Sequence, residues 1–298
     1  MDDLFNVQLN DCPFNAPPYL SGLTHLGCTV SHPTHPFSIL KRLIPGTSCY
    51  DGVGAWPYIC INGPDDLDAL RTGFPDMLTI TAVTQPGYIP PDTTKDGLVL
   101  FKQHYAYDPH LPLKVFSART MARLQQCEKT TDFHIVTDTN RHLRMADLYN
   151  RLKIRRNLTN SYLDFPLSHF EQIAALKNSI FFEVTHKDGI GAIACGVIWG
   201  DVLQMLHMAC SDDGLKWNAS YRLMAGLQAF SEKRHVRLLT GGIPAGGSKG
   251  LGVFKARWAN TMVPVYLLRI INDHEQYNTL CAKNGANPTY FPAYRGPA

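Results

Sequence analysis

The sequence has no long apolar run, no excess of charge of one sign and no Cys-x-x-Cys pair. A membrane-spanning helix needs roughly 18 consecutive apolar residues, and no run reaches that length. The net charge of +3 is too small for a protein that coats nucleic acid. The chain opens with the acidic Met1-Asp2-Asp3 and no apolar stretch follows, so we expect no secretory signal.

The eight cysteines are scattered through apolar and mixed segments, as buried free thiols usually are. They are Cys12, Cys28, Cys49, Cys60, Cys127, Cys195, Cys210 and Cys281. In a chain of this length without a signal, this pattern favours a reducing, cytoplasmic compartment.

One cluster has the spacing of a metal site. Cys28, His32 and His35 follow a C-x3-H-x2-H pattern that could seat a transition metal. Pro33 and Pro36 each follow a histidine, and no fourth ligand lies nearby in the sequence. We therefore expect a proline-rich loop here, and no metal.

Apolar residues make up 45% of the 298 residues and charged residues 18%, which is enough to build a full core and excludes a disordered chain. The length suggests one large domain or two ordinary ones. The first hundred residues are typical of strands and loops, with strands expected at 77–83 and 98–104.

From residue 117 the hydrophobic pattern predicts a mixed order of helices and strands. The expected helices are 117–129, 144–158, 166–176, 218–234 and 275–282. The expected strands are 133–136, 179–185, 192–199, 202–210, 237–240 and 265–271, with a glycine- and proline-rich loop at 243–252. Three consecutive antiparallel-type strands followed by a helix and a further strand are the layout of acyl-CoA N-acyltransferases.

The stretch after residue 238 is more specific. A strand ends in Gly241-Gly242, a short loop follows, and the chain continues as Gly250-Leu251-Gly252-Val253-Phe254-Lys255-Ala256-Arg257-Trp258. This resembles the FemABX-like branch of the GNAT superfamily. Similar segments occur in the right order elsewhere: Tyr50-Asp51 with Trp56-Pro57-Tyr58, Leu148-Tyr149 with Arg156 and Tyr162 to Pro166, and Trp217 to Tyr221.

The resemblance implies an α/β fold with mixed sheets, built as two tandem GNAT-like subdomains with a cleft between them. We place the first at 1–130 and the second at 131–298, which carries the Gly-Gly…Phe-Lys motif. Peptidoglycan-bridge relatives also have a coiled-coil arm. This sequence has no such heptad stretch, so no arm is expected.

The resemblance also implies an activity. We expect an aminoacyltransferase that moves an amino acid from aminoacyl-tRNA onto a primary amine and forms an amide bond, with no further cofactor. The acceptor amine would belong to a peptide, a metabolite, a carrier-protein-bound intermediate, or a nucleotide-linked or cell-wall-type precursor. The alternatives are an acyl-CoA-dependent N-acyltransferase and a non-catalytic GNAT-fold binding module.

Two departures from the family pattern bear on the substrates. Asp212-Asp213 stand where CoA-using relatives place bare backbone amides for the pyrophosphate, and their charges would repel it. This disfavours CoA and favours a tRNA-borne donor. Ala55-Trp56 replace the small residue and tyrosine that the family prefers, which bears on the acceptor pocket.

The catalytic candidates are Lys255, Phe254 and Asp51. Lys255 could stabilise the developing oxyanion and Phe254 could exclude water, or they are a surface charge and a core residue. Asp51 could orient the acceptor amine, or cap a turn. His207, alone in an apolar strand, is interpreted as a core residue rather than a catalytic one.

The remaining candidates are substrate contacts that the resemblance suggests. They are Tyr50, Trp56, Tyr58, Arg156, Trp217, Asn218, Tyr221, Gly241, Gly242 and Arg257. Trp217 and Tyr221 could stack on a terminal adenine, or lie in the core. Arg151, Lys153 and Arg155 share a basic helix with Arg156, which either contacts tRNA phosphates or is a solvated face.

Overall fold

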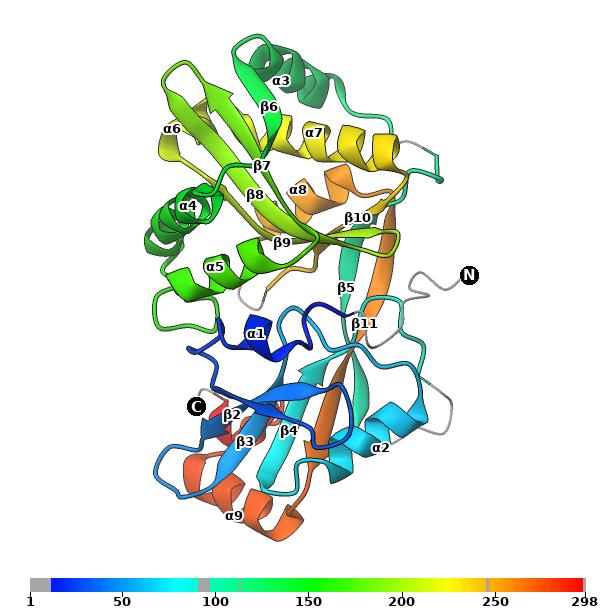
Figure 1. The fold of residues 1–298 in the computed structure, drawn as a ribbon, viewed down its shortest axis with the longest axis vertical. Helices are drawn as coiled ribbons and strands as arrows, with labels where there is room; N and C mark the ends of the chain where they lie inside the picture. The colour runs from blue at the N-terminus through cyan, green and yellow to red at the C-terminus, as the bar shows by residue number, and fades with distance from the viewer. Residues whose placement is uncertain (1–11, 91–96, 113, 245–246, 297–298) are drawn as a thin grey trace. The chain divides into compact units, whose positions relative to one another are not determined.

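The computed structural model describes residues 12–90, 97–112, 114–244 and 247–296 (Figure 1). The chain divides into two units: one contains the residues up to Lys102 and from Pro264 onward, the other Gln103–Val263. These bounds differ from the division at 130/131 expected from the sequence. The C-terminal part joins the first unit because its strand pairs with a strand near residue 80, over a distance in sequence that no local pattern reveals.

The first unit contains a mixed sheet with the strand order β1-β2-β3-β4-β11. The strands are β1 (Cys28–Ser31), β2 (Ser38–Leu43), β3 (Tyr50–Gly54), β4 (Met77–Val83) and β11 (Thr261–Ile271), of which β11 begins in the other unit. β3 and β4 are parallel and are joined by a helix, whereas the other pairs are antiparallel.

Helices and a short C-terminal turn pack on this sheet. They are α1 (Pro17–Leu20), α2 (Pro64–Thr72), α9 (His274–Asn284) and the 3-10 helix η2 (Ala293–Arg295). α9 covers a small core cluster of Ile44, Leu78, Leu280 and Tyr294. This cluster holds the end of the chain against the residues of β4, which places Arg295 beside Asp51.

The second unit contains a sheet with the order β5-β10-β9-β8-β7-β6. The strands are β5 (Leu98–Tyr107), β6 (Thr131–Val136), β7 (Ser179–His186), β8 (Gly189–Trp199), β9 (Val202–Cys210) and β10 (Arg237–Gly241), of which β5 begins in the first unit. β7, β8 and β9 form the expected antiparallel meander, and β10 returns parallel to β9.

Helices cover both faces of the second sheet (Figure 1). They are α3 (Ala118–Glu128), α4 (Arg141–Arg156), α5 (Leu167–Ala175), α6 (Asp212–Lys216), α7 (Ala219–Arg234) and α8 (Lys249–Trp258). α7 packs on one face and α4 and α5 on the other. The α7 side holds the larger core, in which Leu223 and Leu227 of the helix meet Phe182 and Leu203 of the strands.

α8 begins inside the segment expected to be a loop. Ser248 caps the helix by accepting a hydrogen bond from the Leu251 amide, 3.3 Å away. Gly250 and Gly252 lower the helix propensity of the segment, which is why its pattern indicated a loop. At Gly252 a Cβ atom would lie 2.8 Å from the Ile243 side chain, so the glycine is there for close packing.

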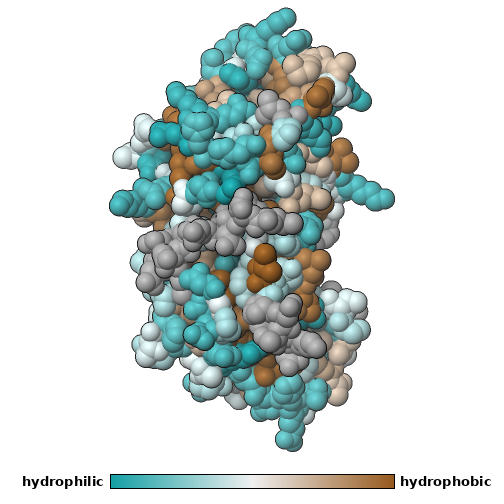
Figure 2. Space-filling view, turned by 90° about the vertical axis from the view of Figure 1, so that its right-hand side faces the viewer, coloured by the Kyte–Doolittle hydropathy of each residue, from teal (hydrophilic) through white to brown (hydrophobic). Residues whose placement is uncertain are grey.

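In the part of the chain that the structure describes, no helix combines the length and the apolar character needed to cross a bilayer. On the face shown in Figure 2, hydrophobic residues are scattered among hydrophilic ones rather than gathered into one broad patch. Single exposed apolar residues such as Val115 and Ile154 are ordinary on a protein surface.

Candidate functional site

Lys255 lies where β10 ends. Its ammonium group donates to the carbonyl oxygens of Thr240 at 2.6 Å, Gly242 at 2.8 Å and Gly241 at 3.3 Å. An ammonium has three donors, so these three contacts can occupy all of them. The sequence suggested a cation with a free end, whereas here it binds the backbone of the glycine pair.

The glycine pair also marks a change of strand partner. β10 is parallel to β9 over Arg237–Leu239 and pairs with β5 as far as Gly241, where the register shifts. Gly241 has a φ of +75°, a conformation that residues with a side chain rarely adopt. β9 continues to Cys210 while β10 has ended, so Lys255 sits where the two strands stop running together.

Three further candidates come together beside α8. Tyr221, at the start of α7, lies with its ring centroid 5.8 Å from that of Phe254 and 5.9 Å from that of Trp258. Arg257 donates to the Tyr221 hydroxyl at 2.6 Å. The motif residues Phe254 and Arg257 therefore lie beside Tyr221, and their roles in catalysis and substrate binding stay predictions.

Sequence reasoning missed a fourth member of this group. Arg123 of α3 also donates to the Tyr221 hydroxyl, at 2.6 Å. Both guanidinium groups lie near the tyrosine ring, with distances of 5.3 Å for Arg123 and 5.5 Å for Arg257 from the central carbon to the ring centroid. The sequence offered a signal for it, since Arg119 and Arg123 lie on the polar side of the helix expected at 117–129.

Trp217 and Asn218 have other surroundings. The Trp217 ring stacks on His186, with centroids 4.2 Å apart, at the turn between β7 and β8. Asn218 adopts a left-handed conformation with a φ of 58° and connects α6 to α7. Trp217 and Tyr221 thus contact different partners within the unit, and their stacking on a terminal adenine stays a prediction.

The basic residues of α4 are paired with acids. Arg151 lies 3.0 Å from Asp147, and Lys153 2.7 Å from Asp164. Arg155 lies 2.6 Å from Asp212 and also donates to the Cys210 carbonyl. Arg156 is exposed at the end of the helix. Pairing reduces the field that this face would offer a phosphate chain, because each acid offsets one cation.

The two aspartates expected to repel CoA are also paired. Besides the Arg155–Asp212 contact, Asp213 lies 2.8 Å from Lys216, whose hydrogen bond lowers the pKa of Asp213. The amides of this turn donate within the protein: Gly214 to the Ser211 hydroxyl, and Ser211 to the Gly191 carbonyl. The amides of Ser211 and Gly214 are therefore not available to a pyrophosphate.

Asp51 lies in the first unit and is fully buried. One carboxylate oxygen accepts from Arg42 at 2.8 Å, and the other accepts from Arg295. The Tyr294 hydroxyl lies 3.4 Å from the same second oxygen. In this structure the carboxylate therefore ties β2, β3 and the C-terminal turn together.

The aromatic candidates beside Asp51 differ in their exposure. Tyr50 is exposed, with the Lys41 ammonium 4.0 Å from its ring centroid. Trp56 is half-buried, and its carbonyl accepts from the Tyr19 hydroxyl at 2.9 Å. Tyr58 is a core residue packed edge-on against Phe14, and burial raises the pKa of its hydroxyl. Of the three, Tyr50 and Trp56 have surface that a substrate can reach.

The Cys28, His32 and His35 segment is a loop in which His32 is already bonded. Its Nδ1 accepts from the backbone amides of Thr34 and His35, at 3.1 and 3.0 Å. Its Nε2 lies 3.1 Å from the Ala69 carbonyl oxygen. Within the described residues no group of three or more His, Cys, Asp or Glu side chains is arranged to hold a metal ion.

His207 is buried and lies against a second histidine. Its Nε2 is 2.9 Å from Nε2 of His169, so one ring donates and the other accepts. Tyr149, Phe165 and Phe170 surround the pair with ring centroids about 5 Å from the His207 ring. This is the environment of a core histidine, as the strand pattern indicated.

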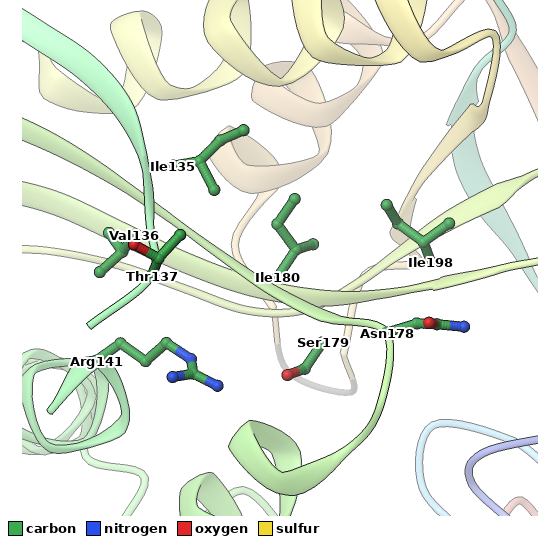
Figure 3. A pocket seen from close by; sticks show the side chains of 8 residues that line it. All are labelled: Ile135, Val136, Thr137, Arg141, Asn178, Ser179, Ile180 and Ile198. Atoms are coloured by element: carbon green, nitrogen blue, oxygen red, sulfur yellow. The ribbon is translucent and has the colours of Figure 1, made fainter. Parts of the chain in front are cut away.

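A cavity of about 480 Å³ opens elsewhere in the second unit. Figure 3 shows Ile135, Ile180 and Ile198 on one side of it, with the Arg141 guanidinium and Ser179 on the other. Arg141 is held by the Ala174 carbonyl at 2.9 Å. None of the sequence-predicted site residues lines this cavity.

Comparison with known proteins gives a match in structure alone. No family model and no curated protein matches the sequence. FemX superposes with a TM-score of 0.55 at 11% identity, over 84% of this chain and 89% of FemX.

Two lysylphosphatidylglycerol synthetase structures agree equally well. The C-terminal domain (DUF2156) of the synthetase from Agrobacterium fabrum has a TM-score of 0.55 and 13% identity, covering 90% of this chain and 91% of that one. L-PGS from Bacillus licheniformis has a TM-score of 0.55 and 13% identity, covering 89% of this chain and 93% of that one. The chain therefore has the fold of FemX and of these synthetase domains, which confirms the fold expected from its resemblance to the FemABX-like branch of the GNAT superfamily.

Proposed function

We propose that this chain is an aminoacyltransferase that takes an aminoacyl group from tRNA and forms an amide bond with a primary amine. The observation that carries the proposal is the position of Lys255, a cation at the end of β10 where β9 and β10 stop pairing, in a fold shared with FemX and L-PGS. Lysylphosphatidylglycerol carries a lysyl group joined to a lipid, so the likeness supports aminoacyl transfer in general, whereas the amide bond to an amine is part of our proposal.

The reaction asks three things of the site. The amine attacks the ester carbonyl, the carbonyl oxygen becomes negative, and the ribose hydroxyl leaves with a proton while the amine loses one. Lys255 would stabilise the oxyanion by exchanging its longest contact, the 3.3 Å one to Gly241, for the substrate oxygen. Phe254, whose ring lies beside that of Tyr221, is proposed to exclude water from the reacting groups.

The donor is proposed to be tRNA rather than CoA for a structural reason. Four backbone amides of the turn at 211–217 already donate to protein acceptors, those of Ser211, Gly214, Leu215 and Trp217. The Gly214 backbone also packs directly against Gly191. A pyrophosphate needs such amides free at a helix start. The acceptor is proposed to be a peptide, a carrier-bound intermediate or a nucleotide-linked precursor with a primary amine, and Asp51, Tyr50 and Trp56 are proposed to lie on its side.

A transfer assay tests the proposal. The protein is incubated with a pool of tRNAs charged with labelled amino acids and a set of primary amines, with labelled acetyl-CoA in a parallel arm. We expect labelled amide in the tRNA arm, none in the acetyl-CoA arm, and a loss of most product in Lys255→Ala. Product in the acetyl-CoA arm alone would show that the donor is acetyl-CoA rather than aminoacyl-tRNA. The absence of product in both arms would favour a binding module.

A further inference from the structure

Two guanidinium groups meet at one tyrosine hydroxyl in the second unit. Arg123 of α3 and Arg257 of α8 each donate to Tyr221 of α7 at 2.6 Å. Their donating nitrogens therefore lie within about 5 Å of each other. Tyr221 is 7% exposed and both arginines are half-buried, so water screens the two charges less than it would on an open surface.

These two arginines differ from others in the same unit. A carboxylate lies within 4.0 Å of each member of the following set: Arg144, Arg151, Arg155, Arg222 and Arg237. No such ion pair is formed by Arg123 or Arg257 within residues 12–90, 97–112, 114–244 and 247–296. Two like charges placed together without an acid leave a site that favours an anion.

We propose that Arg123, Tyr221 and Arg257 form a phosphate-binding site. Each guanidinium has five N–H donors and gives one to Tyr221, and such a planar group is suited to bidentate contact with phosphate oxygens. The Tyr221 oxygen accepts from both arginines, which leaves its own proton as a third donor for the ligand. A phosphate held here neutralises both cations at once.

The position of the site gives the phosphate a role. Arg257 is two residues beyond Lys255 on α8, and Tyr221 packs against Phe254. A donor anchored by a phosphate at this point has its next groups near Phe254, whose ring lies beside that of Tyr221. The assignment of the phosphate to the RNA of an aminoacyl-tRNA rests on the proposed function, whereas the phosphate site itself does not.

Binding without any transfer chemistry tests the site. Isothermal titration measures the affinity for inorganic pyrophosphate, for an uncharged RNA minihelix ending in CCA, and for coenzyme A. The variants are Arg123→Gln, Arg257→Gln and the double variant. Arg234→Gln removes the same charge from an exposed position at the far end of α7 and serves as the matched control.

We expect each single variant to weaken pyrophosphate binding about tenfold or more and the double variant further, with Arg234→Gln unchanged. For the minihelix, the slope of log affinity against log salt falls by somewhat under 1 per lost phosphate contact. Unchanged pyrophosphate and minihelix affinities in the double variant overturn the proposal. If the native protein binds coenzyme A but not the minihelix, and the double variant loses coenzyme A binding, the phosphate site is supported but its ligand is not tRNA.

Thermal unfolding separates a binding role from a structural one. If the arginines serve a ligand, removing one relieves repulsion, so the melting temperature without ligand stays the same or rises. Pyrophosphate then raises the melting temperature of the native sequence and not of the double variant. A fall in the ligand-free melting temperature together with a retained pyrophosphate shift would make the cluster a structural support for Tyr221 and contradict the proposal.

Discussion

At the scale of single residues, Lys255 shows how one side chain can serve structure and chemistry together. Its contacts with three consecutive carbonyl groups hold the glycine pair in place. The motif indicates a catalytic cation or a surface charge, and for either of these Lys255→Ala would be expected to fold normally. The structure changes this expectation, since three acceptors lose a charged donor at once.

We expect Lys255→Ala to lower the free energy of unfolding by about 1–3 kcal/mol, the usual cost of unmade bonds at partly buried acceptors. Its transfer rate at a temperature well below unfolding should fall by about 10²–10³-fold if the ammonium also stabilises the oxyanion. Denaturant unfolding and single-turnover transfer measure the two effects. A destabilised variant with a normal rate would leave Lys255 with the structural role alone.

Asp51 belongs to a buried ion pair with two arginines, Arg42 and Arg295. Asp51→Asn leaves both cations without their carboxylate, and breaking a buried pair of this kind costs about 3–5 kcal/mol. Denaturant unfolding should show this loss, while Asp68→Asn, at an exposed carboxylate, should change stability by less than about 0.5 kcal/mol. An Asp51→Asn protein of normal stability but impaired transfer would instead place Asp51 at the acceptor amine.

At the scale of elements, the proposed contact between the basic face of α4 and tRNA phosphates can be tested quantitatively. Arg151 is the most exposed of the three basic residues predicted to contact tRNA, and Arg156 is exposed beside them. If this face binds the tRNA backbone, Arg151→Glu/Arg156→Glu should lower the salt slope of tRNA binding by about 1.5, somewhat under 1 for each contact. A slope equal to that of the native sequence would assign the face to solvation.

Close packing between β8 and α6 depends on a glycine. A Cβ atom on Gly214 would lie 1.8 Å from the Gly191 carbonyl oxygen, so the helix would have to move away from the strand. Gly250 also lies in the first turn of a helix after a serine cap, but its nearest neighbour would be 3.8 Å away.

We therefore expect opposite effects from the same substitution at these two positions. Gly214→Ala should destabilise the protein by about 2–4 kcal/mol, more than the usual cost of overpacking because the obstacle is backbone. Gly250→Ala should be neutral or stabilise by up to about 1 kcal/mol through helix propensity. Thermal or denaturant unfolding of both variants gives the comparison, and equal effects would contradict the packing argument.

At the scale of the whole molecule, buried thiols make stability depend on alkaline pH. Burial raises the pKa of Cys195 to about 12 and that of Cys210 to about 11. In the unfolded chain a cysteine loses its proton near pH 8.5–9. Above that pH the native state binds more protons than the unfolded state, so stability falls as pH rises.

We expect the free energy of unfolding to be independent of these thiols below about pH 8 and to decrease between about pH 9 and 12, by up to about 1.4 kcal/mol per pH unit for each group. Cys195→Ala should flatten this decrease, whatever its effect on absolute stability. Cys28→Ala, at an exposed cysteine, is the matched control and should leave the slope unchanged. Equal slopes of unfolding free energy against pH in the two variants would show that the Cys195 thiol is not a source of the decrease.

The sequence by itself determined the kind of fold and most of the helices and strands, with α8 the main exception. β4 at 77–83 and β9 at 202–210 occur where the pattern placed them, and the meander of β7, β8 and β9 was readable from strand alternation and turn residues. These features depend on neighbours within a few residues, so a short stretch of sequence is enough to predict them. The motif around Phe254 and Lys255 then indicated the FemABX-like fold, which the structural comparisons support.

Only the tertiary structure decided which side chains meet. Arg123 reaches Tyr221 across 98 positions, and Arg155 reaches Asp212 across 57. It also decided that Lys255 binds three carbonyls and that Asp51 is buried between two arginines. A local pattern contains residue type and periodicity only. The partner of a side chain far along the chain is decided when helices and strands pack, because a buried charge is stable only beside a group that can pair with it.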